Sequence, residues 1–218
     1  MSDATSISRP PSLAETSVRV RDIVASVRTT PSARGTGVFV LVAGPSGAGK
    51  DTLLRIARDW IGHMPKLHFV RRQVTRQANP SIEDHDTLSA QEFTDGVRRG
   101  AFSFFWSANG LWYGVPAVTE TWFGAGDVIV VNVSRTVVPA IVEKYRRVVV
   151  VLVTAPQDIL AERLAARGRE NGVCLDSRLE RAGLAVPEVP ASYVIENTGA
   201  PQDGAGKLSD LLASLCRR

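Results

Sequence analysis

The chain has 218 residues, of which 44% are hydrophobic and 22% charged, as is typical of a globular protein built around one main domain. No apolar run approaches the roughly 20 residues that a membrane-spanning helix needs, and the N-terminal region lacks the pattern of a secretion signal. Two cysteines provide no disulfide framework, so we expect a cytoplasmic protein with no membrane partner.

The formal net charge is +4, and 22 of the 26 basic residues are Arg. Basic charge is typical of nucleic-acid-binding proteins, but here the excess lies at the two ends. Residues 1–36 hold five Arg against three acids, and Arg217 and Arg218 end the chain, so residues 37–216 are formally neutral. We therefore expect no nucleic-acid partner. The Arg content reflects either a coding bias or an enzyme that binds phosphates, which Arg contacts bidentately.

Residues 1–36 are rich in Ser, Thr, Pro and Arg, and we expect an extension outside the folded core. It is either partly disordered or contains one helix. The helical alternative is supported by Ser12 and Glu15, which have the spacing of a capping box, and by apolar residues at helical spacing after them.

From residue 37 onward, short apolar runs alternate with amphipathic stretches. The apolar runs are rich in β-branched residues and predict buried strands at 38–43, 67–70, 128–133, 148–153 and 193–195. Helices are predicted over 51–60, from about 134 to 145, from 156 to about 167, and over 207–215. This alternation indicates an α/β fold whose parallel sheet is flanked by helices on both faces.

Residues 71–123 interrupt the alternation and are expected to be mostly short and irregular. Nine of the fourteen aromatic residues lie between Phe93 and Phe123. We interpret the stretch as an inserted subdomain, and the alternative is a second small core with no ligand role. Trp106 and Trp112 either line a pocket or serve packing alone.

The clearest motif is a phosphate loop with the spacing G-x-x-x-x-G-K, which runs Gly44-Pro45-Ser46-Gly47-Ala48-Gly49-Lys50-Asp51-Thr52. It follows a predicted strand and opens a predicted helix, which is the context that the motif requires. Backbone N–H groups of such a loop surround a phosphate at a helix N-terminus. Lys50 would place its charge on the transferred phosphate, so we expect these nine residues to bind ATP.

The residue after Lys50 is Asp51 rather than Ser or Thr, and a hydroxyl follows one position later at Thr52. A carboxylate beside a polyphosphate is repelled unless a metal ion or an Arg offsets its charge. We expect Thr52 to contact phosphate or the Mg²⁺ shell. Asp51 either contacts Mg²⁺, directly or through water, or pairs with an Arg, or is simply an acid that stabilises the first turn of a helix.

Nucleotide-dependent switches and motors usually carry an acid at the end of a strand that holds Mg²⁺. The predicted strand 128–133 has no acid at its C-terminal end, which argues against these classes. Arginines instead gather in two places, after the second strand and along a segment that could close over the nucleotide as a lid at about 163–181. They are Arg71, Arg72 and Arg76, and then Arg163, Arg167, Arg169, Arg178 and Arg181.

These features resemble the guanylate-kinase-like branch of the P-loop nucleoside monophosphate kinases, over roughly residues 37–216. The resemblance lies in the GKDT loop, Val74-Thr75-Arg76, the segment from Asp84 to Phe93, Tyr113-Gly114, and the lid residues Arg163, Arg167 and Arg178. It implies an acceptor-binding insert at about 71–123 and places Asn197 at the adenine end of ATP.

Two departures separate the chain from guanylate kinases. His85 stands where that family has a Tyr that reads guanine, and Asn79 stands where it has an Arg. A pocket without these partners should hold guanine poorly, because buried polar groups left unmatched reject a ligand.

Four segments, GPSGAGKD, HDTLSAQEF, FFWSANGLWYGV and VNVSR, are similar to the ribose 1,5-bisphosphate phosphokinases of phosphonate degradation. The resemblance implies ATP- and Mg²⁺-dependent phosphorylation of this sugar phosphate to 5-phosphoribosyl 1-diphosphate. An acceptor phosphate is ionised near pH 7 and needs no general base, so catalysis reduces to aligning two anions and neutralising charge.

Roles follow from this chemistry. For catalysis we expect Lys50, Arg163, Arg167 and Arg178. For the acceptor's phosphates we expect Arg72, Arg76 and Arg135, and for its hydroxylated ring His85, Asn109, Tyr113 and Asn132.

Three other functions stay open: guanylate kinase or another small-molecule kinase, a guanylate-kinase-like binding module without catalysis, and a nucleic-acid-binding protein. The intact phosphate loop argues against the binding module. The sequence is compatible with either a monomer or a homodimer.

Overall fold

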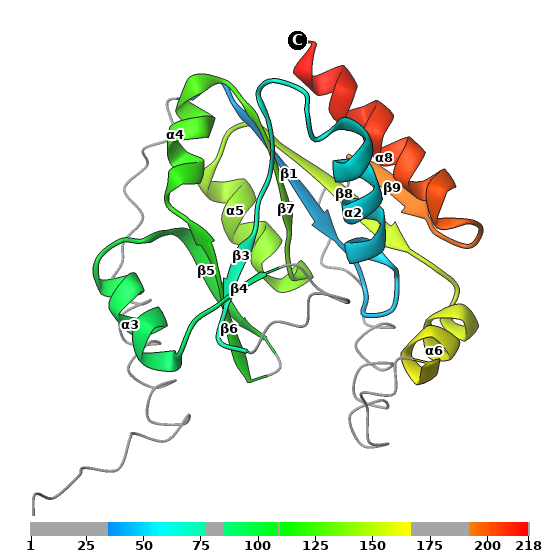
Figure 1. Cartoon of the computed structure of the whole chain (residues 1–218), viewed down its shortest axis with the longest axis horizontal. Helices are drawn as coiled ribbons and strands as arrows, with labels where there is room; N and C mark the ends of the chain where they lie inside the picture. Colours follow the sequence, from blue (N-terminus) through cyan, green and yellow to red (C-terminus); the bar gives the residue numbers. More distant parts are fainter. Residues whose placement is uncertain (1–34, 77–84, 109, 167–191, 218) are drawn as a thin grey trace, which may run out of the picture.

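A computed structural model describes residues 35–76, 85–108, 110–166 and 192–217. Its first sheet contains five parallel strands in the order β2-β7-β1-β8-β9 (Figure 1). The strands are β1 (Val38–Ala43), β2 (Leu67–Phe69), β7 (Val128–Asn132), β8 (Val148–Thr154) and β9 (Tyr193–Glu196). The five strands predicted from apolar runs are confirmed to within one residue at each end.

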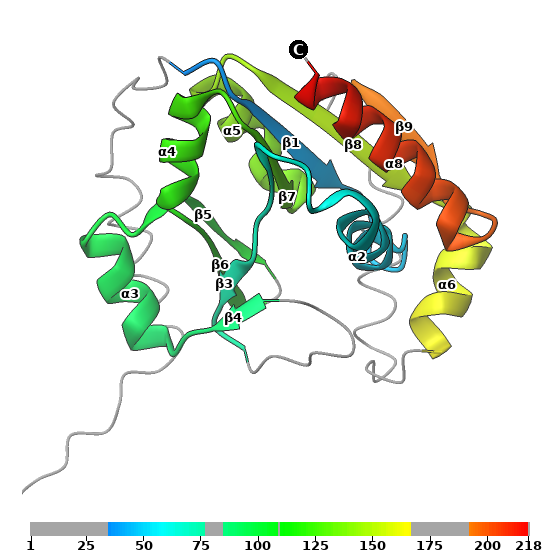
Figure 2. The ribbon, with the colours of Figure 1, turned by 45° about the horizontal axis from the view of Figure 1, so that its top comes forward.

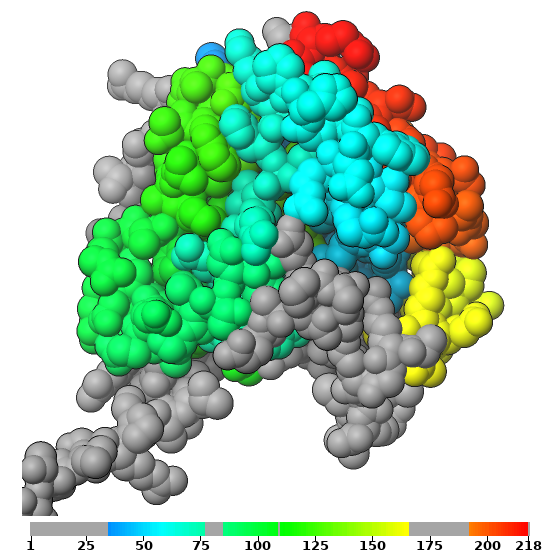
Figure 3. All heavy atoms as spheres, in the orientation of Figure 1, coloured from blue at the N-terminus to red at the C-terminus, as the bar shows by residue number. Residues whose placement is uncertain are grey.

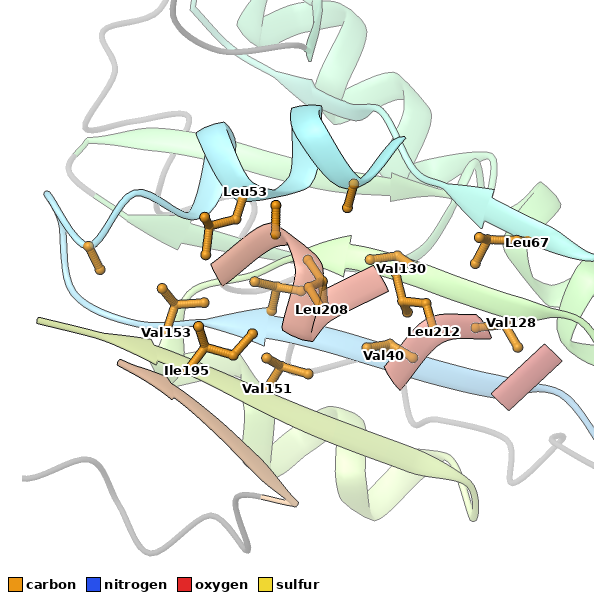
Figure 4. Packing of buried hydrophobic residues seen from close by; sticks show 14 of the residues in the cluster. Val40, Leu53, Leu67, Val128, Val130, Val151, Val153, Ile195, Leu208 and Leu212 are labelled. Atoms are coloured by element: carbon orange, nitrogen blue, oxygen red, sulfur yellow. The ribbon is translucent and has the colours of Figure 1, made fainter. Parts of the chain in front are cut away.

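The sheet is buried on both faces, because side chains along β1 alternate between two cores. Val40 joins the face covered by helices α2 (Lys50–Ile61) and α8 (Pro201–Cys216), where Leu53 and Leu208 pack against the strands (Figure 4). Leu41 joins the opposite face, which is covered by α5 (Val138–Lys144) and the short 3₁₀ turn η1 (Arg135–Val137). Figure 2 shows the helices on either side of the sheet. The predicted α/β fold is confirmed.

The prediction for the last helix was wrong at its start, since α8 begins at Pro201 rather than at 207. Gly204 and Gly206 lowered the helical signal, but Pro is favourable in a first helical turn. Gly204 is buried, and a Cβ on it would stand 3.1 Å from the methyl groups of Leu53. The close approach of α8 to α2 therefore explains why glycine, a weak helix former, stands at position 204.

The expectation that residues 71–123 are mostly irregular was also wrong. The described part of this stretch forms a second sheet in the order β4-β3-β6-β5, with two helices. The elements are β3 (Arg72–Val74), β4 (His85–Thr87), α3 (Ala90–Arg98), β5 (Phe102–Ala108), β6 (Leu111–Pro116) and α4 (Val118–Ala125). Strands of three residues are too short to show a period, and their pairing supplies the stability that the local sequence lacks.

The two faces of the second sheet pack differently. One face carries Trp106 and Tyr113 and joins the core of the parallel sheet on its α5 side. On the other side, Trp112 joins a small separate core with Phe93 and Val97 of α3. Trp106 and Trp112 are both buried in these cores.

We expect Gly114→Ala to destabilise the protein by about 1–3 kcal/mol, because overpacking a filled core has that cost. Gly114 lies in β6, and a Cβ there would stand 2.5 Å from two ring carbons of Phe102. Urea unfolding followed by circular dichroism measures the change. Gly124→Ala is the matched control, since a Cβ there meets no atom within 4 Å. Equal stability of the two variants would contradict the packing.

Candidate active site

The phosphate loop lies where β1 ends and α2 begins, at the carboxyl edge of the parallel sheet. Gly49 has φ +90°, in the left-handed region, and a Cβ on it would stand 2.5 Å from Nδ2 of Asn197. The loop therefore needs glycine here for both its conformation and its neighbour. The predicted strand–loop–helix context is confirmed.

Asn197 is hydrogen-bonded to the phosphate loop. It directly follows β9, only 4% of its surface is exposed, and its Nδ2 donates a hydrogen bond of 2.8 Å to the carbonyl oxygen of Ala48. This bond ties the last strand of the sheet to the loop. The expected contact of Asn197 with adenine stays a prediction, and no local pattern indicated the bond to Ala48.

Lys50 is the first residue of α2, and its side chain turns back over the loop. Its Nζ donates hydrogen bonds of 2.9 Å to the carbonyl oxygens of Gly44 and Pro45. The ammonium group is thereby held at the mouth of the loop, where a phosphate bound to the loop amides would meet it.

Arg163 reaches the loop from α6 (Gln157–Ala166). Its Nη1 lies 4.0 Å from the position of a Cβ on Gly49, is buried, and has no hydrogen-bond partner among the described residues. The surfaces of α6 and the loop adjoin in Figure 3, in yellow and blue. A guanidinium with a buried nitrogen beside an anion-binding loop suits a phosphate contact. Arg167, Arg178, Asn79, Asn109, most of the predicted lid and the predicted helix after Ser12 lie outside the described residues.

Asp51 contacts two predicted acceptor residues. Nδ2 of Asn132, the last residue of β7, donates a hydrogen bond of 2.7 Å to Oδ1 of Asp51. The guanidinium of Arg72 lies 4.0 Å from the same oxygen. Of the alternatives for Asp51, the structure shows the pairing with an Arg, in the first turn of α2. The contact between Asn132 and Asp51 was not predicted from the sequence. The one feature that could have indicated it is that Asn132 is a polar residue at the end of a buried strand.

Arg72 begins β3 and points from the second sheet toward the loop. Its side chain is 8% exposed, and its guanidinium lies 5.5 Å from the centre of the Tyr113 ring, which stacks on Trp106. Burial lowers the pKa of Arg72, and the charges of Asp51 and Tyr113 oppose that shift. The structure thus brings Arg72, Asp51, Asn132 and Tyr113 together.

His85 lies beside Arg72, its partner in the parallel ladder of β3 and β4. Its Nε2 is 3.2 Å from the carbonyl oxygen of Arg76, and its buried Nδ1 has no partner among the described residues. Burial lowers the pKa of His85, and the charges of Arg76, Arg72 and Arg71 lower it further, against the hydrogen bond to Arg76. The imidazole is therefore held neutral, with Nε2–H as donor and Nδ1 as acceptor.

Arg135 follows β7 in the turn η1, which Ser134 caps by accepting a hydrogen bond from the backbone N–H of Thr136. Burial lowers the pKa of the half-buried Arg135. Asn132 is the last residue of β7 and Arg135 comes shortly after it, so both lie at the same carboxyl edge of the sheet as the phosphate loop.

A phosphate loop at the edge of a parallel sheet, faced by a buried arginine from a second sheet, defines a P-loop kinase with a guanylate-kinase-like fold. Its fold is similar to that of guanylate kinase from Anaplasma phagocytophilum, with a TM-score of 0.64, 20% identity, and coverage of 84% of this chain and 88% of that one. Residues 40–180 match the profile of the AAA domain family.

Proteins of similar sequence show which family of kinases the chain belongs to. The ribose 1,5-bisphosphate phosphokinase PhnN of Chelativorans sp. (strain BNC1) is 44% identical over 172 residues, which cover 78% of this chain and 82% of that protein. The protein of the same name from Methylobacterium radiotolerans is 46% identical, over 79% of this chain and 95% of that protein. The chain belongs to the ribose 1,5-bisphosphate phosphokinase family and is a kinase.

Two structural observations bear on the remaining expectations. Within the described residues, no helix is both long and apolar enough to cross a membrane. The same residues contain no group of three or more His, Cys, Asp or Glu side chains that could hold a metal ion.

Proposed function

We propose that this protein transfers the γ-phosphoryl group of ATP to ribose 1,5-bisphosphate, giving ADP and 5-phosphoribosyl 1-diphosphate, in the cytoplasm and in phosphonate catabolism. The observation that carries the proposal is the buried Arg72, which extends from the second sheet to within 4.0 Å of the phosphate-loop residue Asp51. It offers an acceptor phosphate a cation beside the nucleotide phosphates. Membership of the family supplies the identity of the acceptor.

The reaction forms a bond between an oxygen of the acceptor phosphate and the γ-phosphorus, and it breaks the bond from that phosphorus to ADP. The attacking oxygen already carries negative charge near pH 7, so no proton has to be removed. The protein must align two anions and balance their charge. On the nucleotide side this falls to Lys50 and Arg163, together with Arg167 and Arg178.

On the acceptor side, Arg72, Arg76 and Arg135 would hold the phosphates. His85 suits the sugar ring, because its neutral Nδ1 can accept a hydrogen bond from a hydroxyl group. Asn109 is proposed for the same ring. Tyr113 is mostly buried between Trp106 and Arg72, which supports a role in orienting Arg72 as well as in lining the site. Asn132 would act on the site through its hydrogen bond to Asp51.

Asp51 and Thr52 would hold Mg²⁺. Their carboxylate and hydroxyl oxygens are the donors that this ion prefers, and 32% of the Asp51 side chain is exposed. The bound ion would neutralise charge on the nucleotide phosphates. Arg72 would orient the acceptor phosphate toward that charge.

Guanylate kinase is the alternative that the fold similarity favours. We expect kcat/KM for ribose 1,5-bisphosphate to exceed that for GMP by about 10⁴-fold, because a site built to bond the sugar phosphate leaves buried polar groups unpaired with a mismatched ligand. A coupled assay of ADP release, with ATP and Mg²⁺ held constant, measures both. Fast turnover with GMP and none with ribose 1,5-bisphosphate would make the protein a guanylate kinase.

A further inference from the structure

Asp51, Arg72 and Asn132, which we call the Asp51 cluster, join three separate parts of the fold. Asp51 belongs to the phosphate loop and α2, Asn132 ends β7 of the parallel sheet, and Arg72 begins β3 of the second sheet. The hydrogen bond from Asn132 fixes the carboxylate at 2.7 Å. The cluster therefore lies between the nucleotide site and the proposed acceptor site.

In the Asp51 cluster, the Asp51 carboxylate and an acceptor phosphate would compete for the charge of Arg72. Arg72 is almost fully buried, and a buried cation needs an anion nearby; Asp51 supplies one at 4.0 Å. An acceptor phosphate at Arg72 would supply another, and it would then lie close to the Asp51 carboxylate. Two anions beside one partly desolvated cation repel each other, so Asp51 opposes the acceptor phosphate unless a further positive charge balances it.

We propose that Asp51 makes binding of the acceptor depend on the metal-loaded nucleotide, because its carboxylate opposes an anion at Arg72 until a cation at the nucleotide phosphates balances it. Asn132 is the positioning residue that holds the carboxylate where it can interact with either side. This inference rests on the proposed function for the identity of the acceptor. It adds that the two substrate sites are coupled through one side chain.

The test is isothermal calorimetry of ribose 1,5-bisphosphate binding, with the loop saturated by a non-hydrolysable ATP analogue, with and without Mg²⁺. In the wild-type protein we expect Mg²⁺ to tighten acceptor binding about tenfold or more, within the usual range of coupling between sites. In Asp51→Asn, which keeps the hydrogen bond from Asn132, acceptor binding without Mg²⁺ should be tightened, and the effect of Mg²⁺ should shrink to about threefold or less.

With Mg²⁺ at concentrations that saturate the bound nucleotide in both proteins, its screening of the nucleotide's own phosphates contributes equally, so the difference between them isolates Asp51. Asp95→Asn is the control for net charge, because Asp95 pairs with Arg98 on α3, away from the cluster. Asp51→Ser is a second variant that also removes the charge, for use if Asp51→Asn fails to fold. The inference is overturned if removing the charge weakens acceptor binding without Mg²⁺, or leaves the effect of Mg²⁺ unchanged.

The outcome also separates this inference from the proposed function. If ribose 1,5-bisphosphate does not bind even with Mg²⁺ and the nucleotide analogue, the proposed substrate is wrong. Inorganic phosphate then serves as the anion, again with the loop already filled. If Mg²⁺ tightens phosphate binding and this effect depends on Asp51, the inference holds without the sugar. If the effect does not depend on Asp51, the inference is wrong.

Discussion

Lys50→Ala is expected to lower kcat by about 10²–10³-fold or more, because a positioned charge on a reacting group contributes at least that much. The fold should stay intact. The Nζ of Lys50 bonds to the carbonyl oxygens of Gly44 and Pro45, and losing such bonds near the surface costs about 1 kcal/mol. Initial rates at saturating substrates and a thermal melt give the two values.

Lys207→Ala is the matched control, since Lys207 is exposed on α8 and outside the phosphate loop. It should turn over at the wild-type rate. If Lys50→Ala also retained that rate while folded, the assignment of the phosphate loop would be wrong.

Arg72→Met is expected to reduce kcat/KM for the acceptor by roughly 100- to 1000-fold, because Arg would make two charge-assisted hydrogen bonds to a phosphate. Met has a similar volume, and the Asp51 carboxylate that loses Arg72 as a partner is 32% exposed and keeps the hydrogen bond from Asn132, so we expect the variant to fold. The affinity for the ATP analogue should change little. Steady-state kinetics with varied acceptor, and nucleotide titration by calorimetry, measure the two effects.

Arg71 provides the comparison. It precedes Arg72 directly, but its side chain is exposed and pairs with Asp86 at 2.9 Å. Exposed pairs of this kind contribute little, so Arg71→Met should keep kcat/KM within a few-fold of wild type. Equal losses in the two variants would mean that general positive charge, rather than Arg72 in its buried position, attracts the acceptor.

The features that could be predicted from the sequence depend on neighbours along the chain. Buried strands such as 38–43 appear as apolar runs, and the phosphate loop appears as a fixed spacing between a strand and a helix. Both follow from periodicity and backbone geometry within a few residues. Arg72 could be named as a candidate because it follows the second predicted strand, and His85 because of the resemblance to guanylate kinases. The sequence did not show that the two are partners across β3 and β4.

The errors and omissions lie where distant residues decide the structure. The three-residue strands β3 and β4 are stabilised by pairing within the second sheet, so their sequences alone predicted irregular structure. The helix α8 begins earlier than its glycines suggest, because Gly204 packs against Leu53 of α2. In both cases tertiary contacts outweigh local propensity.

The sequence by itself determined that this chain has an α/β fold with a phosphate loop and arginines placed to meet phosphates. Only the tertiary structure decided how the site is joined. Asn132 and Asp51 are 81 positions apart, and Asn197 and Ala48 are 149 apart. These contacts arise because parallel strands bring their carboxyl ends to one edge, whatever the length of chain between them. The position of each strand in the sheet follows from packing of the whole core, which no local pattern records.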